Sequence, residues 1–378
     1  MKIVLTGVET NNKGAELMLY AILQEIERKW PETEVYSEPE AVPQGLDYVR
    51  TNVKLRYWPL SDFERRLHLN GMLRRLHLPL IKDRKAVKAD FLLDGSGFCF
   101  SDQCGMWGRK ADWWEALLKR QQKHGARIVF LPQAFGPIEK EDTKAVIRVL
   151  SRYATCLMPR EKVSYDYLEK TGLVNMQKVK IYMDFTSLVE GVFPTKYENL
   201  RNGICIIPNM RMIDKGGVSM DDYLVFLAAI IEEGQKSDHI VYLLNHEGRK
   251  DEWLAHECTR RLNNSIEVVS NVNALEVKGL IASSYLVITS RFHGLASALN
   301  SCVPSLATSW SHKYSELFMN YGLNGCIMPL NDNEKAISMV KDLCEKGKND
   351  AVRSHLLEIQ KEIQDNTNEM WRYIWYGL

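Results

Sequence analysis

Arg291 and His293 are two residues apart. In the sequence they follow the apolar run of residues 286–288 and two small polar residues. Gly294 follows, and the small or apolar side chains of residues 295–299 are typical of the buried start of a helix. A helix N-terminus offers unpaired backbone N–H groups and the positive end of the helix dipole. In the same loop, a guanidinium would add a group that binds an anion, and an imidazole would add a proton donor. The alternative is a surface loop with two solvated polar side chains.

Two further arginines also follow apolar runs that predict strands, Arg160 in the run PREKVS and Arg211 in the run PNMR. Arginine is the side chain best suited to bidentate binding of a carboxylate or a phosphate. Arginines in loops behind strands therefore predict a compact, multiply charged anion as the ligand. For Arg160, the alternative is a solvated salt bridge with the neighbouring Glu161.

Side chains that can bind sugar hydroxyls occur in other loops behind predicted strands. Residues 7–16, GVETNNKGAE, combine glycines with asparagines and glutamates, and DGSG at residues 94–97 is a second such turn. Amides and carboxylates hydrogen-bond hydroxyl groups, and glycine permits close approach of the backbone. The alternative is a pair of ordinary turns, with asparagine capping a helix. In the first of these loops, the side chains that can bind a sugar are Asn11, Asn12 and Glu16.

Composition and motifs restrict the class of protein. A net charge of +1 gives no general field for nucleic acid, so no nucleic-acid partner is expected. The sequence contains no HExxH, EF-hand, P-loop, GxSxG or GxGxxG motif, which predicts neither a metal nor a nucleotide cofactor. Eight cysteines are scattered without CxxC pairs, as in reduced cytosolic proteins. The strand-like start and the absence of a run of about 18 apolar residues predict a cytoplasmic protein.

Short apolar runs alternate with longer helical patterns, which predicts parallel α/β construction. One domain is expected over residues 1–198 and a second over residues 199–350. Together they would face an interdomain cleft between their carboxyl edges. A helix over residues 351–378 could fold back on the first domain. Strands are expected at residues 2–6, 90–94, 127–131, 155–158, 178–183, 203–207, 240–245, 267–269, 286–289, 305–308 and 325–328.

Several of these segments together resemble the polysaccharide pyruvyl transferase family. The resemblance implies a GT-B-like pair of Rossmann-type domains, with the acceptor bound by the first domain and phosphoenolpyruvate (PEP) by the second. It also implies transfer of a pyruvyl unit from PEP to two hydroxyls of one sugar, which forms a cyclic ketal and releases phosphate. The matching segments are SRFHGLASALNSCVPSLATSWSHKYSELFMNYGL (290–323), NNKGAELML (11–19), DGSG (94–97), LPQAFGP (131–137) and PREKVS (159–164).

The resemblance also implies roles for individual residues. Arg291 and His293 match the RxH pair of the family. His293 is expected to protonate C3 of PEP, while Arg291 binds its charged groups. A sugar hydroxyl then attacks C2, phosphate departs and the second hydroxyl closes the ring, without a metal or a cofactor. Arg160, Arg211 and the backbone at Gly294 are expected to complete the PEP site.

The acceptor sugar is expected to be bound by loops of the first domain, with the candidates Asn11, Asn12, Glu16, Asp94, Ser96 and Gln133. The base that takes the proton of the attacking hydroxyl is left open between Glu16 and Asp94. Two departures from the family pattern are mild. Glu161 stands where an aspartate is common, and Tyr314 follows Lys313.

Residues 64–88 carry eight Lys and Arg side chains against two acidic ones, with leucines between them. Such a segment can bind anionic headgroups or a lipid diphosphate, which predicts a lipid-linked capsule or cell-wall acceptor at the inner face of the membrane. The alternative is a solvated helix that covers the core with its leucines. The oligomeric state is left open.

Two other functions are open as well. One is a GT-B nucleotide-sugar glycosyltransferase or epimerase, for which residues 245–247 and Glu276 are the only candidate nucleotide contacts. The other is a protein that binds an anion or a carbohydrate without catalysis, which would need no proton donor beside Arg291.

Overall fold

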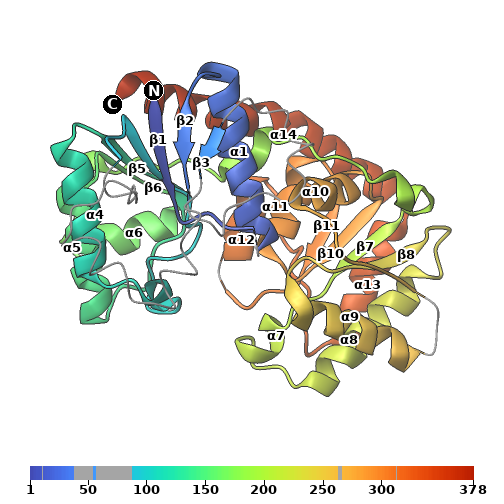
Figure 1. Cartoon of the computed structure of the whole chain (residues 1–378). Helices are drawn as coiled ribbons and strands as arrows, with labels where there is room; N and C mark the ends of the chain where they lie inside the picture. Colours follow the sequence, from blue (N-terminus) through green and yellow to red (C-terminus); the bar gives the residue numbers. More distant parts are fainter. Residues whose placement is uncertain (11, 38–53, 57–86, 263–265, 312) are drawn as a thin grey trace, which may run out of the picture. The chain divides into compact units, whose positions relative to one another are not determined.

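The computed structural model describes residues 1–10, 12–37, 54–56, 87–262, 266–311 and 313–378 (Figure 1). They form two compact units, each with its own parallel sheet. The candidate residue Asn11 and all but the last two residues of the basic segment 64–88 lie outside the described residues. The first unit consists of Met1–Thr10, Met18–Phe185 and Asn366–Leu378, and the second of Asn11–Leu17 and Thr186–Asp365.

The boundary between the units differs from the one expected at residue 198. The chain enters the second unit after Phe185, and the Val192 N–H is held there by Leu275 O at 2.9 Å. The end of the C-terminal helix belongs to the first unit, where Trp375 Nε1 donates to Glu25 Oε1 at 2.9 Å.

The first unit is built on six parallel strands in the order β3-β2-β1-β4-β5-β6. This is the strand order of the Rossmann fold. The short strands β2 and β3 were not expected from the sequence, because three residues are too few to show the hydrophobic pattern of a strand. The strands are β1 (Lys2–Thr6), β2 (Glu34–Tyr36), β3 (Lys54–Arg56), β4 (Phe91–Asp94), β5 (Arg127–Gln133) and β6 (Cys156–Pro159).

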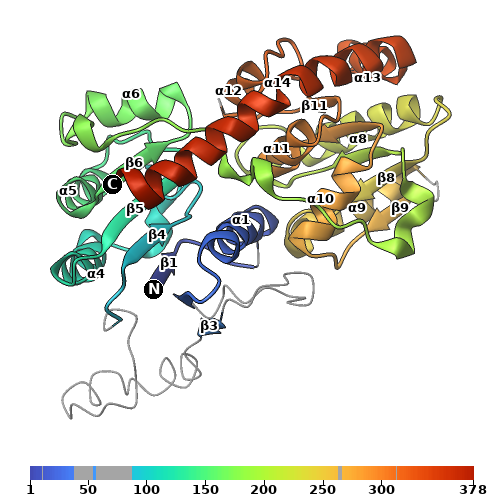
Figure 2. The same cartoon turned by 90° about the horizontal axis from the view of Figure 1, so that it is seen from above.

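Helices cover both faces of this sheet (Figure 2). α4 and α5 bury Trp114 and Ile147 in one cluster with Leu92 of the sheet. Successive strand residues point to opposite faces, and on the other face Phe91 packs edge-on against Trp375 at 5.1 Å. Apolar strands are thus buried on both sides. The helices are α1 (Lys13–Lys29), α4 (Ala111–Lys123), α5 (Glu141–Tyr153) and α6 (Lys162–Lys170).

The second unit contains five parallel strands in the order β11-β10-β7-β8-β9. They are β7 (Ile204–Ile207), β8 (Val241–Leu244), β9 (Glu267–Val269), β10 (Leu286–Thr289) and β11 (Ser305–Ala307). Its helices are α7 (Arg211–Asp214), α8 (Met220–Gly234), α9 (Gly248–Leu262), α10 (Ala274–Ala282), α11 (Phe292–Asn300), α12 (Lys313–Asn320) and α13 (Asn333–Cys344). α14 (Lys346–Arg372) continues into the π-helical turn Tyr373–Gly377 of the first unit.

Helices lie on both faces of this sheet as well. α8, α9 and α13 pack on the face that presents Ile206 and Ile288. α10 and α11 pack on the face that presents Ile207 and Val287. Each unit is therefore a three-layer, doubly wound domain.

Two expected strands, at residues 178–183 and 325–328, do not form. Each segment makes one isolated bridge, to the edge strands β6 and β11 respectively. Val179, Tyr182 and Met328 are buried beside these edge strands, but no continuous ladder forms. The helix expected to open at Gly294 begins at Phe292, and the C-terminal helix begins at Lys346. Short 3-10 turns lie at Gly105–Gly108, Met176–Lys178, Phe185–Leu188 and Thr195–Leu200.

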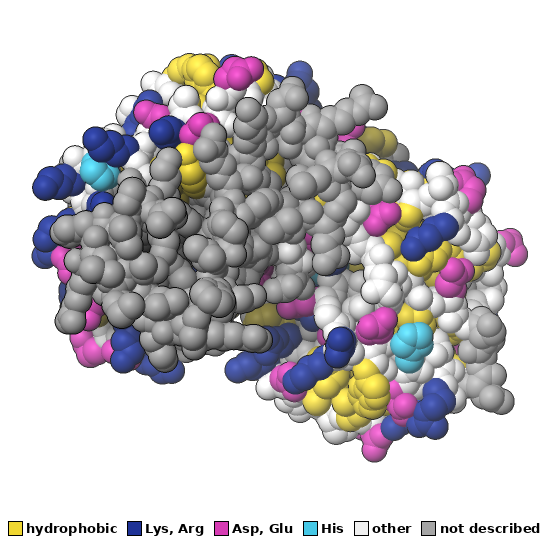
Figure 3. Space-filling view, viewed as in Figure 1, with side chains coloured by type: hydrophobic (Ala, Val, Ile, Leu, Met, Phe, Trp, Pro, Cys, Tyr) yellow, Lys and Arg dark blue, Asp and Glu magenta, His cyan; other side chains and the backbone are white. Residues whose placement is uncertain are grey.

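Basic and acidic side chains of the described residues are interspersed on the face seen in Figure 3, in keeping with the net charge of +1. Within the described part of the chain, no helix has both the length and the apolar content that crossing a bilayer requires.

Candidate functional site

The second sheet reverses its strand order between β7 and β10. These strands are neighbours, and the chain proceeds from β7 toward β8 and β9 on one side and from β10 to β11 on the other. In doubly wound sheets, ligands bind beyond the carboxyl ends of the strands at such a reversal. The loop after β10 carries Arg291, and the loop after β7 carries residues 209–211. The residues from which the sequence predicts an anion site therefore lie at the position where sheets of this kind bind ligands.

A buried hydrogen-bond network fixes the loop after β10. Ser290 O accepts from Asn209 Nδ2 and from Tyr314 OH, each at 2.8 Å. Ser290 Oγ lies 2.7 Å from Tyr223 OH and 2.6 Å from Thr308 Oγ1. All five side chains are buried. Because the network joins the loops after β7, β10 and β11, the arginine that follows the serine is placed by three strands.

Arg291 is the N-cap residue of α11, and two carboxylates hold its guanidinium. Nε donates to Asp251 Oδ2 at 2.9 Å, and Nη2 contacts the same oxygen. Nη1 donates to Glu247. Asp251 Oδ1 accepts the Met210 N–H at 3.0 Å, which ties α9 to the loop after β7. The sequence predicted a cation at this position but neither of its two partners.

His293, the second residue of α11, lies against the first turn of α1. A Cβ on Gly14 would come closer than 3.0 Å to three atoms of the imidazole ring. Only glycine fits at this position. Asn12 Oδ1 accepts the N–H groups of Gly14 at 2.8 Å and Ala15 at 3.3 Å, and so caps the helix.

Two further residues lie near Arg291 and His293, namely His246 and Lys13, and the sequence did not predict them as part of an anion site. Burial holds the pKa of His246 well below its usual range, and the positive charges of Arg291, His293 and Lys13 add to the effect. The His246 imidazole is therefore neutral. Its position offered a signal, since it follows β8 as Arg291 follows β10. The sequence connected His246 only with the nucleotide-sugar alternative.

Asn12 and Glu16 are separated from the other candidate sugar ligands. The sequence placed both on the first domain, whereas the packing of Gly14 on His293 places them in the second unit. The Glu16 side chain is fully buried, and its Oε2 lies 2.7 Å from Lys13 Nζ in a salt bridge. Asn12 is the capping residue that the alternative reading described.

The first sheet reverses its order between β1 and β4, and three candidate sugar ligands meet there. Asp94 Oδ2 accepts from Thr6 Oγ1 at 2.8 Å. Its Oδ1 accepts from Gln133 Nε2 and from the Ser96 N–H, each at 3.2 Å. Gly7 has a φ of +72°, and a Cβ there would strike Ser96, so the two loops touch. Burial raises the pKa of Asp94, and the hydrogen bonds offset part of this rise.

Arg160 lies in the first unit, not in the unit of Arg291. It is 4% exposed, with salt bridges to Glu161 at 3.3 Å and Asp184 at 3.6 Å. Arg160 thus forms the salt bridge with Glu161 that was the alternative to an anion ligand, but the pair is buried and not solvated.

Arg211 and Gly294 lie with Arg291. Arg211 is exposed at the start of α7, and its backbone N–H donates to Asn209 Oδ1 at 2.9 Å. A Cβ on Gly294 would stand 2.7 Å from Thr289 Oγ1, so glycine allows α11 to begin this close to β10.

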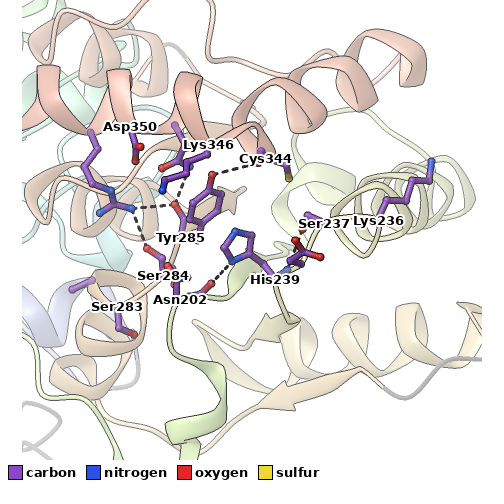
Figure 4. A pocket seen from close by; sticks show the side chains of 14 residues that line it. Asn202, Lys236, Ser237, His239, Ser283, Ser284, Tyr285, Cys344, Lys346 and Asp350 are labelled. Carbon is purple, nitrogen blue, oxygen red and sulfur yellow. Dashed lines mark hydrogen bonds between the residues drawn. The ribbon is translucent and has the colours of Figure 1, made fainter.

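The pocket in Figure 4 lies at the opposite edge of the second sheet. Its volume is about 730 Å³, and Asn202, His239 and Tyr285 on its wall precede β7, β8 and β10. The His239 ring stacks on Tyr285 with centroids 3.7 Å apart. Arg353 donates to the backbone carbonyls of Ser284 and Tyr285. This pocket is thus distinct from the site at the carboxyl edge. No cluster of three His, Cys, Asp or Glu side chains suited to a metal occurs among the residues described.

A family model described as polysaccharide pyruvyl transferase matches residues 12–312. No curated protein is significantly similar to the chain. Among solved structures, Anabaena HepE in complex with UDP and glucose superposes with a TM-score of 0.61 at 12% identity, over 99% of both chains. The UDP-GlcNAc 2-epimerase of Neisseria meningitidis bound to UDP-GlcNAc superposes with a TM-score of 0.61 at 9% identity, again over 99% of both. At such identities the likeness concerns the fold, and the GT-B-like class expected from the sequence is confirmed.

Proposed function

The chain belongs to the polysaccharide pyruvyl transferase family, and on this premise we propose that it transfers a pyruvyl group from PEP to two hydroxyls of one sugar. The products are a cyclic pyruvate ketal and phosphate. The observation that carries the proposal is the placement of Arg291 and His293 at the start of α11, at the reversal of the second sheet. Ligand sites of doubly wound sheets lie there.

Arg291 and the start of α11 bind the donor. PEP carries a carboxylate and a phosphate, and a guanidinium with two parallel N–H groups suits either of them. The N-terminal N–H groups of α11 add donors at the positive end of its dipole. Arg211 is exposed on the loop after β7 and supplies a second cation. Arg160 is left out of this donor site, because it is buried against two carboxylates in the first unit.

His293 protonates the donor. A proton passes from the imidazole to C3 of PEP, so the methylene becomes a methyl group and C2 becomes an oxocarbenium-like centre. A bound dianion favours the protonated imidazole that this step needs. One sugar hydroxyl adds to C2 and gives up its proton, the bond from C2 to the phosphate oxygen breaks, and the second hydroxyl adds to C2. The protons of the two hydroxyls balance the one taken by C3 and the one carried away by phosphate.

The acceptor is bound by Asp94, Ser96 and Gln133. Asp94 is the proposed base toward the attacking hydroxyl, since burial raises its pKa and makes it a stronger proton acceptor than an ordinary carboxylate. Glu16 is the less suitable candidate, because its carboxylate is committed to Lys13. A lipid-diphosphate-linked sugar is the proposed acceptor, through the basic residues of segment 64–88.

The test is to incubate the protein with PEP and a panel of lipid-linked and nucleotide-linked sugars. Phosphate release and the mass of the sugar are then measured together. The expected result is release of phosphate that depends on one acceptor, and a gain of one pyruvyl unit less water on that sugar. If no acceptor in the panel leads to release of phosphate from PEP, and the protein binds UDP but not PEP, the nucleotide-sugar alternative is favoured.

A further inference from the structure

The two carboxylates that bind Arg291 differ in their burial and in their other contacts. The Asp251 side chain is 1% exposed, and its second oxygen accepts the Met210 N–H at 3.0 Å. The Glu247 side chain is 28% exposed. Besides Arg291, no salt-bridge partner of Glu247 occurs among the residues that the structure describes. Asp251 is therefore fixed in the interior, whereas Glu247 contacts Arg291 from a partly exposed position.

The N–H groups of the guanidinium are divided between the two acids. Asp251 takes Nε and Nη2, which form one edge of the fork. Glu247 takes Nη1, on the edge that remains for a ligand. Bidentate binding of a carboxylate or a phosphate needs two adjacent N–H groups, so such a ligand and Glu247 compete for the same position on Arg291.

The charge around Arg291 points in the same direction. One guanidinium faces two carboxylates, which leaves the trio with a net negative charge. His246 adds no positive charge because its pKa is low. Glu247 therefore offsets part of the attraction that Arg291, with His293 and Lys13 near it, exerts on a multiply charged anion.

We propose that Glu247 occupies, in the ligand-free protein, the place on Arg291 that the donor's anionic group takes, and that it leaves when the donor binds. Asp251 stays and positions the guanidinium throughout. Glu247 thereby weakens binding of the donor and hastens release of phosphate. This inference rests on the proposed function, because it takes PEP as the ligand of Arg291.

The local backbone allows such an exchange. Glu247 precedes Gly248, which has a φ of +65° and open space where a Cβ would stand. The partly exposed Glu247 side chain can rotate toward solvent without disturbing the core. Asp251 cannot, since it is buried inside the first turn of α9.

The experiment is a calorimetric titration of PEP into the wild-type protein and three variants, Glu247→Gln, Asp251→Asn and the control Glu252→Gln. Glu252 is a half-buried carboxylate on the same helix, outside the network of Arg291. Glu247→Gln is expected to tighten PEP binding about threefold to tenfold, the range expected for removal of a partly exposed competing ion pair. Glu252→Gln is expected to bind PEP like the wild type, and Asp251→Asn to bind it more weakly.

A second titration with inorganic phosphate separates this inference from the proposed function. If the wild-type protein binds phosphate but neither binds PEP nor transfers pyruvate, the proposed function fails, and the phosphate affinity of Glu247→Gln still tests the exchange. If Glu247→Gln binds both probes no more tightly than the wild type does, the exchange is wrong whatever the enzyme's substrate. In steady-state assays the exchange predicts a lower KM for PEP in Glu247→Gln without a higher kcat.

Discussion

Gly14 lies against the imidazole of His293, and the space between them does not admit a side chain. The first turn of α1 therefore acts as a wall of the site that carries Arg291 and His293. The glycine is needed for this contact and not for the helix, since glycine is the poorest helix former after proline.

Replacing Gly14 with alanine separates these two effects. The extra methyl group should favour helix α1 by up to about 1 kcal/mol, yet it should displace His293 and lower pyruvyl transfer at least about tenfold. Gly347→Ala is the matched control, because its Cβ would meet no atom closer than 4.0 Å. Thermal unfolding and transfer rates of both variants are the measurements. A Gly14→Ala enzyme with full activity would mean that the position of His293 does not matter.

Replacing His293 with alanine should leave PEP binding within a few fold and lower transfer about 10²–10⁴-fold, as expected for a lost general acid. Arg291→Ala should instead abolish PEP binding. His256→Ala, an exposed histidine on α9, is the control. If His293→Ala kept near-wild-type transfer while Arg291→Ala abolished it, His293 would not be the acid. Loss of stability together with activity would indicate a structural histidine.

Replacing Asp94 with asparagine should stabilise the protein at neutral pH. Burial raises the folded-state pKa of Asp94 above its unfolded value, so ionising this carboxyl in the folded protein costs free energy. The cost is absent in acid, where both states are protonated. It grows as the pH rises from the unfolded pKa to the folded one, and is constant above. Asp94→Asn should therefore raise Tm by a few degrees near pH 7 and by much less near about pH 4.

The same substitution tests the proposed base. Asparagine can keep the hydrogen bonds to Thr6 and Gln133 but cannot accept a proton, so transfer should fall while Tm rises. A variant that is more stable and fully active would exclude Asp94 as the base toward the acceptor.

Replacing Ser290 with alanine should lower the free energy of unfolding by about 1–3 kcal/mol, because it leaves the buried hydroxyls of Tyr223 and Thr308 without their shared partner. Chemical denaturation measures this. Ser354→Ala, at an exposed position of α14, is the control and should change stability little. PEP binding should also weaken, since the loop of Arg291 loses one of its supports. Unchanged stability would mean that the network is dispensable.

Neutralising Arg65, Arg66, Arg74 and Arg75 should reduce binding to vesicles that contain anionic lipid, and rising salt should weaken it further. Flotation on a density gradient measures both. If the variant floats as the wild type does, segment 64–88 does not bind the membrane.

Much of the fold could be predicted from single runs of residues. β10 has the bounds expected, because apolar residues buried on both faces leave an uninterrupted hydrophobic run. Residues 178–183 bury Val179 and Tyr182 while Ile181 is exposed, and they make one isolated bridge to β6 without forming a strand. Apolar residues in the sequence therefore indicate burial more reliably than they indicate pairing of the backbone in a sheet.

The site was predicted only in part, for a related reason. The order of strands and loops places Arg291 and His293 at a carboxyl edge, so their loop could be found from local sequence. Asp251 and Glu247 lie on a different loop and helix, and nothing near them in the sequence indicates a partner 40 or 44 residues away. The assignment of α1 likewise depends on a contact between Gly14 and His293 that only the tertiary structure reveals.

The two sheets each reverse their order once, and the two reversals carry opposite chemistry. One presents a guanidinium and an imidazole, the other a carboxyl group, an amide and hydroxyls. If donor and acceptor are divided in this way, a change in the loops of β1 and β4 alters which sugar is modified without altering what is transferred. Descendants of one ancestral gene could then decorate different polysaccharides with the same group, and a laboratory exchange of those loops alone should transplant acceptor choice.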